Sequence, residues 1–119
     1  MRILVKDITT TGAAGSAAGS TDFQAYPGEQ LKAVSLDYIT APATTVISVT
    51  NPDVPGNPTV TVPAGNTDRI VRPRLPVQDA NSADIMGTAE PVQVQGRVAV
   101  AVSNADAASP AVRVRLFMA

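Results

Sequence analysis

Residues suited to catalysis are few in this chain. It contains no His and no Cys, which excludes Ser–His and Cys–His nucleophile pairs, an imidazole base, and a zinc site built from these ligands. Its two glutamates, Glu29 and Glu90, stand beside a glycine and a proline in expected turns. A glycosidase-like carboxylate pair would have to form in space rather than along the chain. We therefore expect a protein without enzymatic activity that uses no cofactor and no metal.

Arginine is the charged residue type that stands out, since the chain has seven Arg and only two Lys. Three arginines fall within residues 69–74, and two more share one face of the last expected strand. These side chains are either solvated on strand exteriors or placed at a protein interface, where the planar guanidinium pairs with carboxylates. A stretch of small residues near the N-terminus can become ordered against another subunit. The candidate interface residues are Thr11, Gly12, Arg69, Arg72, Arg74, Arg113 and Arg115.

Charge and composition exclude several classes of partner. Nine basic residues against ten acidic ones leave a net charge of −1, so no field attracts nucleic acid or an acidic membrane. Two Phe, two Tyr and no Trp provide no stacking platform for bases. No apolar run reaches the roughly 18 residues of a membrane span, and the stretch 1–5, which charged residues follow, is too short for a signal peptide. We expect no nucleic-acid partner and no membrane partner. We also expect the protein to be synthesised in a cytoplasm and not to be exported.

The stretch from Val92 to Met118 carries the clearest secondary-structure pattern. Valines alternate with other residues over 92–102, and the alternation resumes after the turn-forming residues 104–110. A period of two is typical of a strand with one apolar face. The stretch therefore predicts a hairpin that a second layer must cover. Ala99 and Ala101 on the opposite face indicate further cover, either by the chain's own loops or by a partner chain.

The remaining pattern predicts short strands joined by turns. Ten Pro and eight Gly interrupt the chain, which favours an all-β antiparallel sandwich or barrel over long helices. We expect one domain over residues 1–119 with about eight short strands, a bulge near Lys32 or Ala33 and a flexible loop or arm over 9–22. Residues 75–91 lack a clean period and are expected to form a long loop with a short helical turn around 80–85. The strands expected before the hairpin cover 3–8, 22–26, 30–39, 44–50, 59–62 and 67–74.

Several segments follow one another in a recognisable order. A stretch of small residues leads into Gly28–Tyr38 (GEQLKAVSLDY), and Pro-Ala-Thr-Thr at 42–45 opens the next strand. Pro73-Arg74 follows, with Val77 and Asp79 just beyond, and the Val-rich stretch closes the chain. This order resembles that of the small decoration, or cement, proteins of tailed-bacteriophage heads. The resemblance covers nearly all of the chain from Ile3 onward.

The resemblance implies a jelly-roll-like β-sandwich that binds the outer surface of an assembled capsid and stabilises it. Its partners would be the major capsid protein and further copies of itself, as a dimer or trimer. Its location would be the outside of the virion, after synthesis in the host cytoplasm.

Two other functions remain open from the sequence. One is a receptor- or carbohydrate-binding β-sandwich of a tail fibre or adhesin, although sugar faces usually stack on aromatic rings and only four are present. The other is a hydrolase, which would need a carboxylate cluster that includes Glu29 or Glu90.

Overall fold

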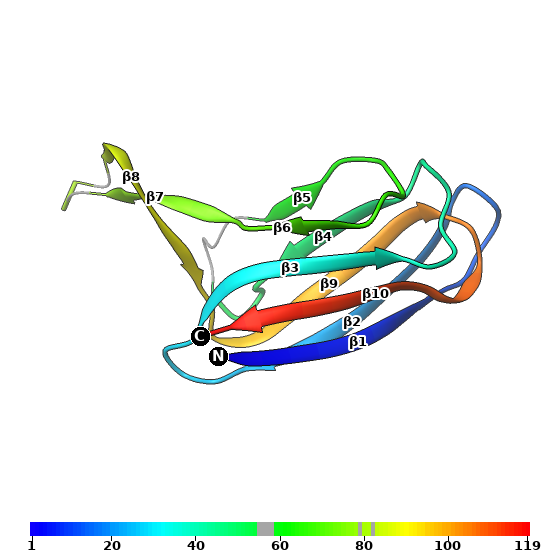
Figure 1. Cartoon of the computed structure of the whole chain (residues 1–119), viewed down its shortest axis with the longest axis horizontal. Coiled ribbons are helices and arrows are strands. Elements are labelled where there is room, and N and C mark those ends of the chain that lie inside the picture. Colours follow the sequence, from blue (N-terminus) through cyan, green and yellow to red (C-terminus); the bar gives the residue numbers. More distant parts are fainter. Residues whose placement is uncertain (55–58, 79, 82) are drawn as a thin grey trace.

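The chain folds into two antiparallel sheets that pack face to face, with a hairpin that projects from one end (Figure 1). The computed structural model describes residues 1–54, 59–78, 80–81 and 83–119, and none of these is helical. Within this part of the chain, no helix therefore has the length and apolar character needed to cross a membrane. The strands are β1 (Arg2–Thr10), β2 (Ala17–Ala25), β3 (Gln30–Tyr38), β4 (Val46–Thr50), β5 (Val60–Val62), β6 (Arg69–Val71), β7 (Arg74–Gln78), β8 (Asp84–Gln93), β9 (Gly96–Ala105) and β10 (Ala108–Met118).

The strand order is that of a jelly roll. One sheet runs β1-β10-β3, with β6 paired to β3, and the other runs β2-β9-β4-β5. The pairs β1–β10, β2–β9, β3–β6 and β4–β5 are all antiparallel, as in two interlocked Greek keys. The predicted all-β, jelly-roll-like sandwich is confirmed. Eight of the strands described form it, and β7 with β8 is an addition between β6 and β9.

The core lies between the two sheets and consists mainly of small aliphatic side chains. Strand β9 contributes Val98, Val100 and Val102, and β10 contributes alternate residues from Val112 to Met118, all at most 1% exposed. Each buried Val adds about 1.5 kcal/mol or more to stability through apolar burial. The faces predicted by the alternation of residues are therefore confirmed. Phe23 of β2 is also part of this core.

The predicted hairpin over 92–118 is wrong. Strands β9 and β10 follow one another in sequence but lie in opposite sheets, where β9 pairs with β2 and β4 while β10 pairs with β1 and β3. Their apolar faces meet across the core, so each strand belongs to the layer that covers the other. Alternation identifies the buried face of a strand but not its neighbours in the sheet. Ala101 on the outer face of β9 is exposed, so the chain's own loops do not cover this position.

The expected loop over 9–22 consists largely of strand. Thr10 ends β1 and Ala17 begins β2, and both are buried. Thr11 forms a bridge with Ala18, and the amide of Gly15 donates a hydrogen bond to the carboxylate of Asp106 at 2.8 Å. Small residues are used here because two backbones approach closely, which leaves little space for side chains. The compositional pattern that predicted a free arm is therefore the signature of tight packing between β1 and β2.

The expected loop over 75–91 is also wrong, because most of it forms the β7–β8 hairpin. Gln78 pairs with Asp84 near its tip and Arg74 pairs with Pro91 near its base. Ala80 and Asn81 lie in a turn rather than a helix, and residues 79 and 82 lie outside the described residues. Most of the side chains described on β8 beyond its base are exposed, so no buried face imposes a period of two.

A cluster of polar contacts closes the sandwich beside its chain ends. Arg2 forms an ion pair with Glu29, donates from Nη2 to the carbonyl oxygen of Gln24 at 2.9 Å and lies 3.7 Å above the ring of Tyr26. The hydrogen bond from Arg2 holds the pKa of Glu29 below its usual value, although burial acts in the opposite direction. These contacts tie β1 to the segment between β2 and β3.

Candidate functional site: a basic and apolar groove beside β3

The outer face of the β1–β10–β3–β6 layer carries apolar side chains that are open to solvent. Strand pairing places Ile3, Phe117 and Ala33 in one row, and the next row runs from Val5 on β1 to Ile70 on β6. Ile3, Val5 and Ile70 are 54%, 50% and 52% exposed. Apolar residues gathered on one face are typical of a surface that contacts another protein.

A gap in the sheet hollows this face next to β3. Strand β6 pairs with residues 34–36 of β3, and β8 pairs with residues 30–31. Among the described strands, none pairs with Lys32 or Ala33 on that side. Arg74 spans part of the gap, because its Nη1 atom donates a hydrogen bond to the carbonyl oxygen of Lys32 at 3.0 Å. The side chain of Arg74 thus makes a hydrogen bond with the backbone of Lys32 where no neighbouring strand described here does so.

The predicted bulge in β3 coincides with this gap. Phe117 of β10 pairs with Ala33, but the next residue, Met118, pairs with Leu31. One residue, Lys32, is therefore extra on β3. The bulge allows both Leu31 and Val34 to face the core, and it is confirmed at the position where the sequence lost its alternation.

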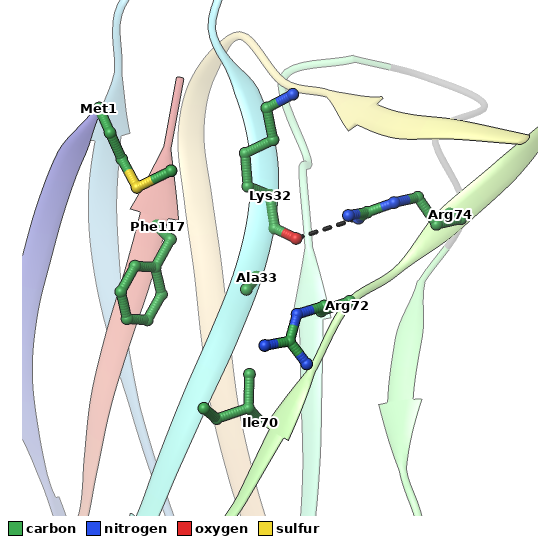
Figure 2. A pocket seen from close by; sticks show the side chains of 7 residues that line it. All are labelled: Met1, Lys32, Ala33, Ile70, Arg72, Arg74 and Phe117. Atoms are coloured by element: carbon green, nitrogen blue, oxygen red, sulfur yellow. Dashed lines mark hydrogen bonds between the residues drawn. The ribbon is translucent and has the colours of Figure 1, made fainter.

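A groove of about 390 Å³ lies over the gap (Figure 2). This volume falls within the range of about 300–1,000 Å³ that is typical of binding pockets. In Figure 2, Met1 and Phe117 stand on one side of β3, whereas Ile70, Arg72 and Arg74 stand on the other. The lining is apolar at Met1, Ala33, Ile70 and Phe117 and basic at Lys32, Arg72 and Arg74.

The groove is positively charged because its cations lack acidic neighbours. No carboxylate lines it, and within the described residues neither Lys32 nor Arg72 forms an ion pair. The Arg74 guanidinium is held by backbone carbonyls, which leaves its charge uncompensated. An apolar floor beside three cations favours a partner segment with apolar and acidic side chains.

The remaining arginines of this face are neutralised within the chain. Arg113 binds Asp7 through two hydrogen bonds, Nε to Oδ1 at 2.8 Å and Nη2 to Oδ2 at 3.3 Å. This contact holds the pKa of Asp7 below its usual value. Arg115 forms an ion pair with Asp37 in the neighbouring strand. Both ion pairs are partly exposed, so each adds little to the stability of the fold. Their main effect is to orient the side chains on the surface of the sheet.

The structure separates the predicted interface residues into different environments. Arg72 and Arg74 both lie in the groove. Arg69 pairs with the buried Leu36 and so belongs to the opposite face of β6. Thr11 and Gly12 lie in the β1–β2 connection at the far end of the sandwich, where Gly12 adopts a φ of +129°. The seven residues therefore do not form one surface.

Sequence reasoning missed most of the groove, namely Met1, Lys32, Ala33, Ile70 and Phe117. One signal was available: Phe117 shares the nominally polar face of β10 with two arginines. A large aromatic residue on such a face indicates a contact outside the core. The other residues come from strands far apart in sequence and carry no common pattern.

Two further features do not define a site. No group of three or more metal-ligating side chains occurs in the described residues. The hydroxyl of Tyr38 is buried without a hydrogen-bond partner in the described part of the chain, and burial raises its pKa, so this group remains protonated and uncharged at neutral pH.

Comparisons with models of known families, with curated proteins and with solved structures gave no match to this chain. The structure by itself defines a jelly-roll β-sandwich with an exposed groove that is both apolar and basic.

Proposed function

We propose that this protein is a non-enzymatic structural protein that binds the outer surface of an assembled bacteriophage capsid and stabilises it. The observation that carries the proposal is the groove beside β3, where exposed apolar residues adjoin three cations without acidic partners. The resemblance in sequence order to decoration proteins supplies the choice of partner, the major capsid protein.

The physical basis of such binding is a preformed surface on a rigid scaffold. Strand pairing holds β1, β10, β3 and β6 in register, so the backbone of the groove loses little freedom when a partner docks. Arginine is enriched at protein interfaces, and its charge also speeds association with an acidic partner. A shell offers many identical sites, so a modest gain at each one sums to a large stabilisation of the whole.

Co-sedimentation with purified shells of the parent virus tests the proposal. We expect saturable binding to expanded shells at physiological salt and none to unassembled capsid subunits. Arg72→Gln should weaken binding, whereas Thr61→Glu on β5 of the other sheet should not. The two variants change the net charge equally, so only the location of the change differs.

If the protein pelleted with neither expanded nor unexpanded shells, the proposal would be contradicted. Receptor and glycan screens would then test the alternative of a tail-fibre or adhesin module. Equal binding to free subunits and to shells would also count against a decoration role.

A further inference from the structure

The apolar side chains of the groove belong to a larger surface on the outer face of the β1–β10–β3–β6 layer (Figure 1). Ile3 and Val5 of β1 are 54% and 50% exposed and do not line the groove. Strand pairing places them in the two rows that lead across the sheet to the groove. We call this surface the apolar stripe, and its apolar members are Ile3, Val5, Phe117, Ala33 and Ile70.

The apolar stripe is longer across the strands than along them. Three spacings of about 4.8 Å separate β1 from β6, which gives a length of about 14 Å. Successive rows on one face of a sheet are about 7 Å apart, and the third row consists of Asp7, Arg113 and Asp37. Arg115 in the second row forms its ion pair with Asp37 in the third. Charged side chains therefore bound the stripe after two rows.

Both lateral edges of this layer are protected against the addition of a further strand. At β1, the side chains of Arg2 and Lys6 reach past the edge to β2, where they donate hydrogen bonds to the carbonyl oxygens of Gln24 and Asp22. Charged side chains at an edge oppose pairing with another chain, and so does a very short edge strand. At the other edge, β6 has only three residues. A partner is therefore expected to dock on the face of the layer rather than beside it.

A segment that covers this face has to satisfy its own backbone hydrogen bonds. An extended peptide laid flat on the stripe would bury amide and carbonyl groups without partners, which is unfavourable. A further sheet would pair these groups, but it would also cover the charged third row. An α-helix pairs them internally, is about 10 Å across and measures about 15 Å for ten residues. The two rows of the stripe therefore fit a helix better than a strand or a sheet.

The cations of the groove indicate the charge pattern of such a helix. Lys32, Arg72 and Arg74 all lie at the β3–β6 end of the stripe. The two arginines farther along the same face already form ion pairs with aspartates of neighbouring strands. Acidic side chains on the partner are therefore favoured at one end of the stripe only.

We infer that the docking element of the capsid protein is an amphipathic α-helix of about three turns, which crosses β1, β10, β3 and β6 and places acidic residues over the groove. Its apolar residues, at positions i, i+3, i+4 and i+7, contact the apolar stripe. The inference rests on the proposed function for the identity of the partner. It adds the secondary structure, the charge pattern and the direction of the contacting segment.

Binding of variants to expanded shells of the parent virus tests the length of the stripe. Ile3→Gln alters the stripe outside the groove and is expected to weaken binding about five- to tenfold, because a half-exposed isoleucine becomes buried on docking. Ile39→Gln is the matched control, since Ile39 is 46% exposed just after the far end of β3, and it should bind as the wild type does. Wild-type binding by Ile3→Gln would overturn the inference, because the contact would then be confined to the groove.

Photocross-linking identifies the partner segment independently of these affinities. Ile3 or Ile70 is replaced by p-benzoylphenylalanine, the variant is irradiated on expanded shells, and the cross-linked capsid residues are located by mass spectrometry. Both positions should react with one capsid segment, at residues three or four apart within each site. The two sites should be about nine residues apart, because a helix rises about 1.5 Å per residue over the 14 Å of the stripe.

The outcomes separate the inference from the proposed function. Cross-linked residues spaced by two, or reaction of the two positions with separate segments, would overturn the helix and leave the proposed function in place. If neither the wild type nor any variant pelleted with shells, the proposed function and the helix would both be contradicted.

Discussion

Gly19 in β2 distinguishes a pair of packed strands from a free arm over residues 9–22. A methyl group added at Gly19 would lie 2.1 Å from the carbonyl oxygen of Thr9 and 3.2 Å from Cγ2 of Ile8. Cβ contacts below 3.0 Å essentially do not occur. The nearest atom belongs to the backbone of β1, so Gly19→Ala forces one strand to move relative to the other.

The sign of the effect on stability differs between the two arrangements. Overpacking of a filled site costs about 1–3 kcal/mol of unfolding free energy. In a free arm the same substitution would restrict only the unfolded chain and would stabilise the protein by about 0.4–1 kcal/mol, or not at all. We therefore expect Gly19→Ala to be destabilising by about 2 kcal/mol, near the middle of the overpacking range.

Urea unfolding followed by far-UV circular dichroism measures this difference. With a urea dependence of about 1–3 kcal/mol per molar, the midpoint should fall by about 1 M. The adjacent Ser20→Ala is the control, because Ser20 is exposed and such changes alter stability by no more than about 0.5 kcal/mol. A midpoint for Gly19→Ala at or above that of the wild type would refute the packed arrangement of β1 and β2.

Two further predictions concern polar contacts. Because its pairing with Arg2 lowers the pKa of Glu29 from the usual 4.5, this carboxylate stabilises the fold above pH 4.5, and the contribution is lost as the pH falls through the lower folded-state value. The urea midpoint of Glu29→Gln should therefore fall less than that of the wild type on acidification, and parallel falls would contradict this role. Asn51 is buried, and its Nδ2 atom donates to the carbonyl oxygens of Gln95 (2.8 Å) and Arg97 (2.7 Å). Asn51→Ala leaves these groups unpaired and should cost about 1–3 kcal/mol in the same assay; an unchanged midpoint would show that water replaces the side chain.

The sequence was most informative where one face of a strand is buried. Alternation identified the inward residues of β9 and β10, and its interruption after Leu31 located the bulge in β3. Both signals arise from the pleat, which turns successive side chains to opposite faces whatever the strand pairs with. Where no face is buried, as among most of the described side chains of the β7–β8 hairpin, alternation gives no signal. Residues 75–91 were for that reason mistaken for a loop.

The sequence by itself therefore determined the class of fold and the buried faces of the strands. Its lack of His and Cys also ruled out chemistry that depends on these residues. Only the tertiary structure decided that β9 and β10 belong to opposite sheets, and that Met1, Lys32, Ile70 and Phe117 surround one groove. The physical reason is that side-chain alternation is a local property of the backbone, whereas strand pairing joins distant segments. The entropic cost of closing a loop rises only slowly with its length, so segments distant in sequence can pair in a sheet at a modest extra cost.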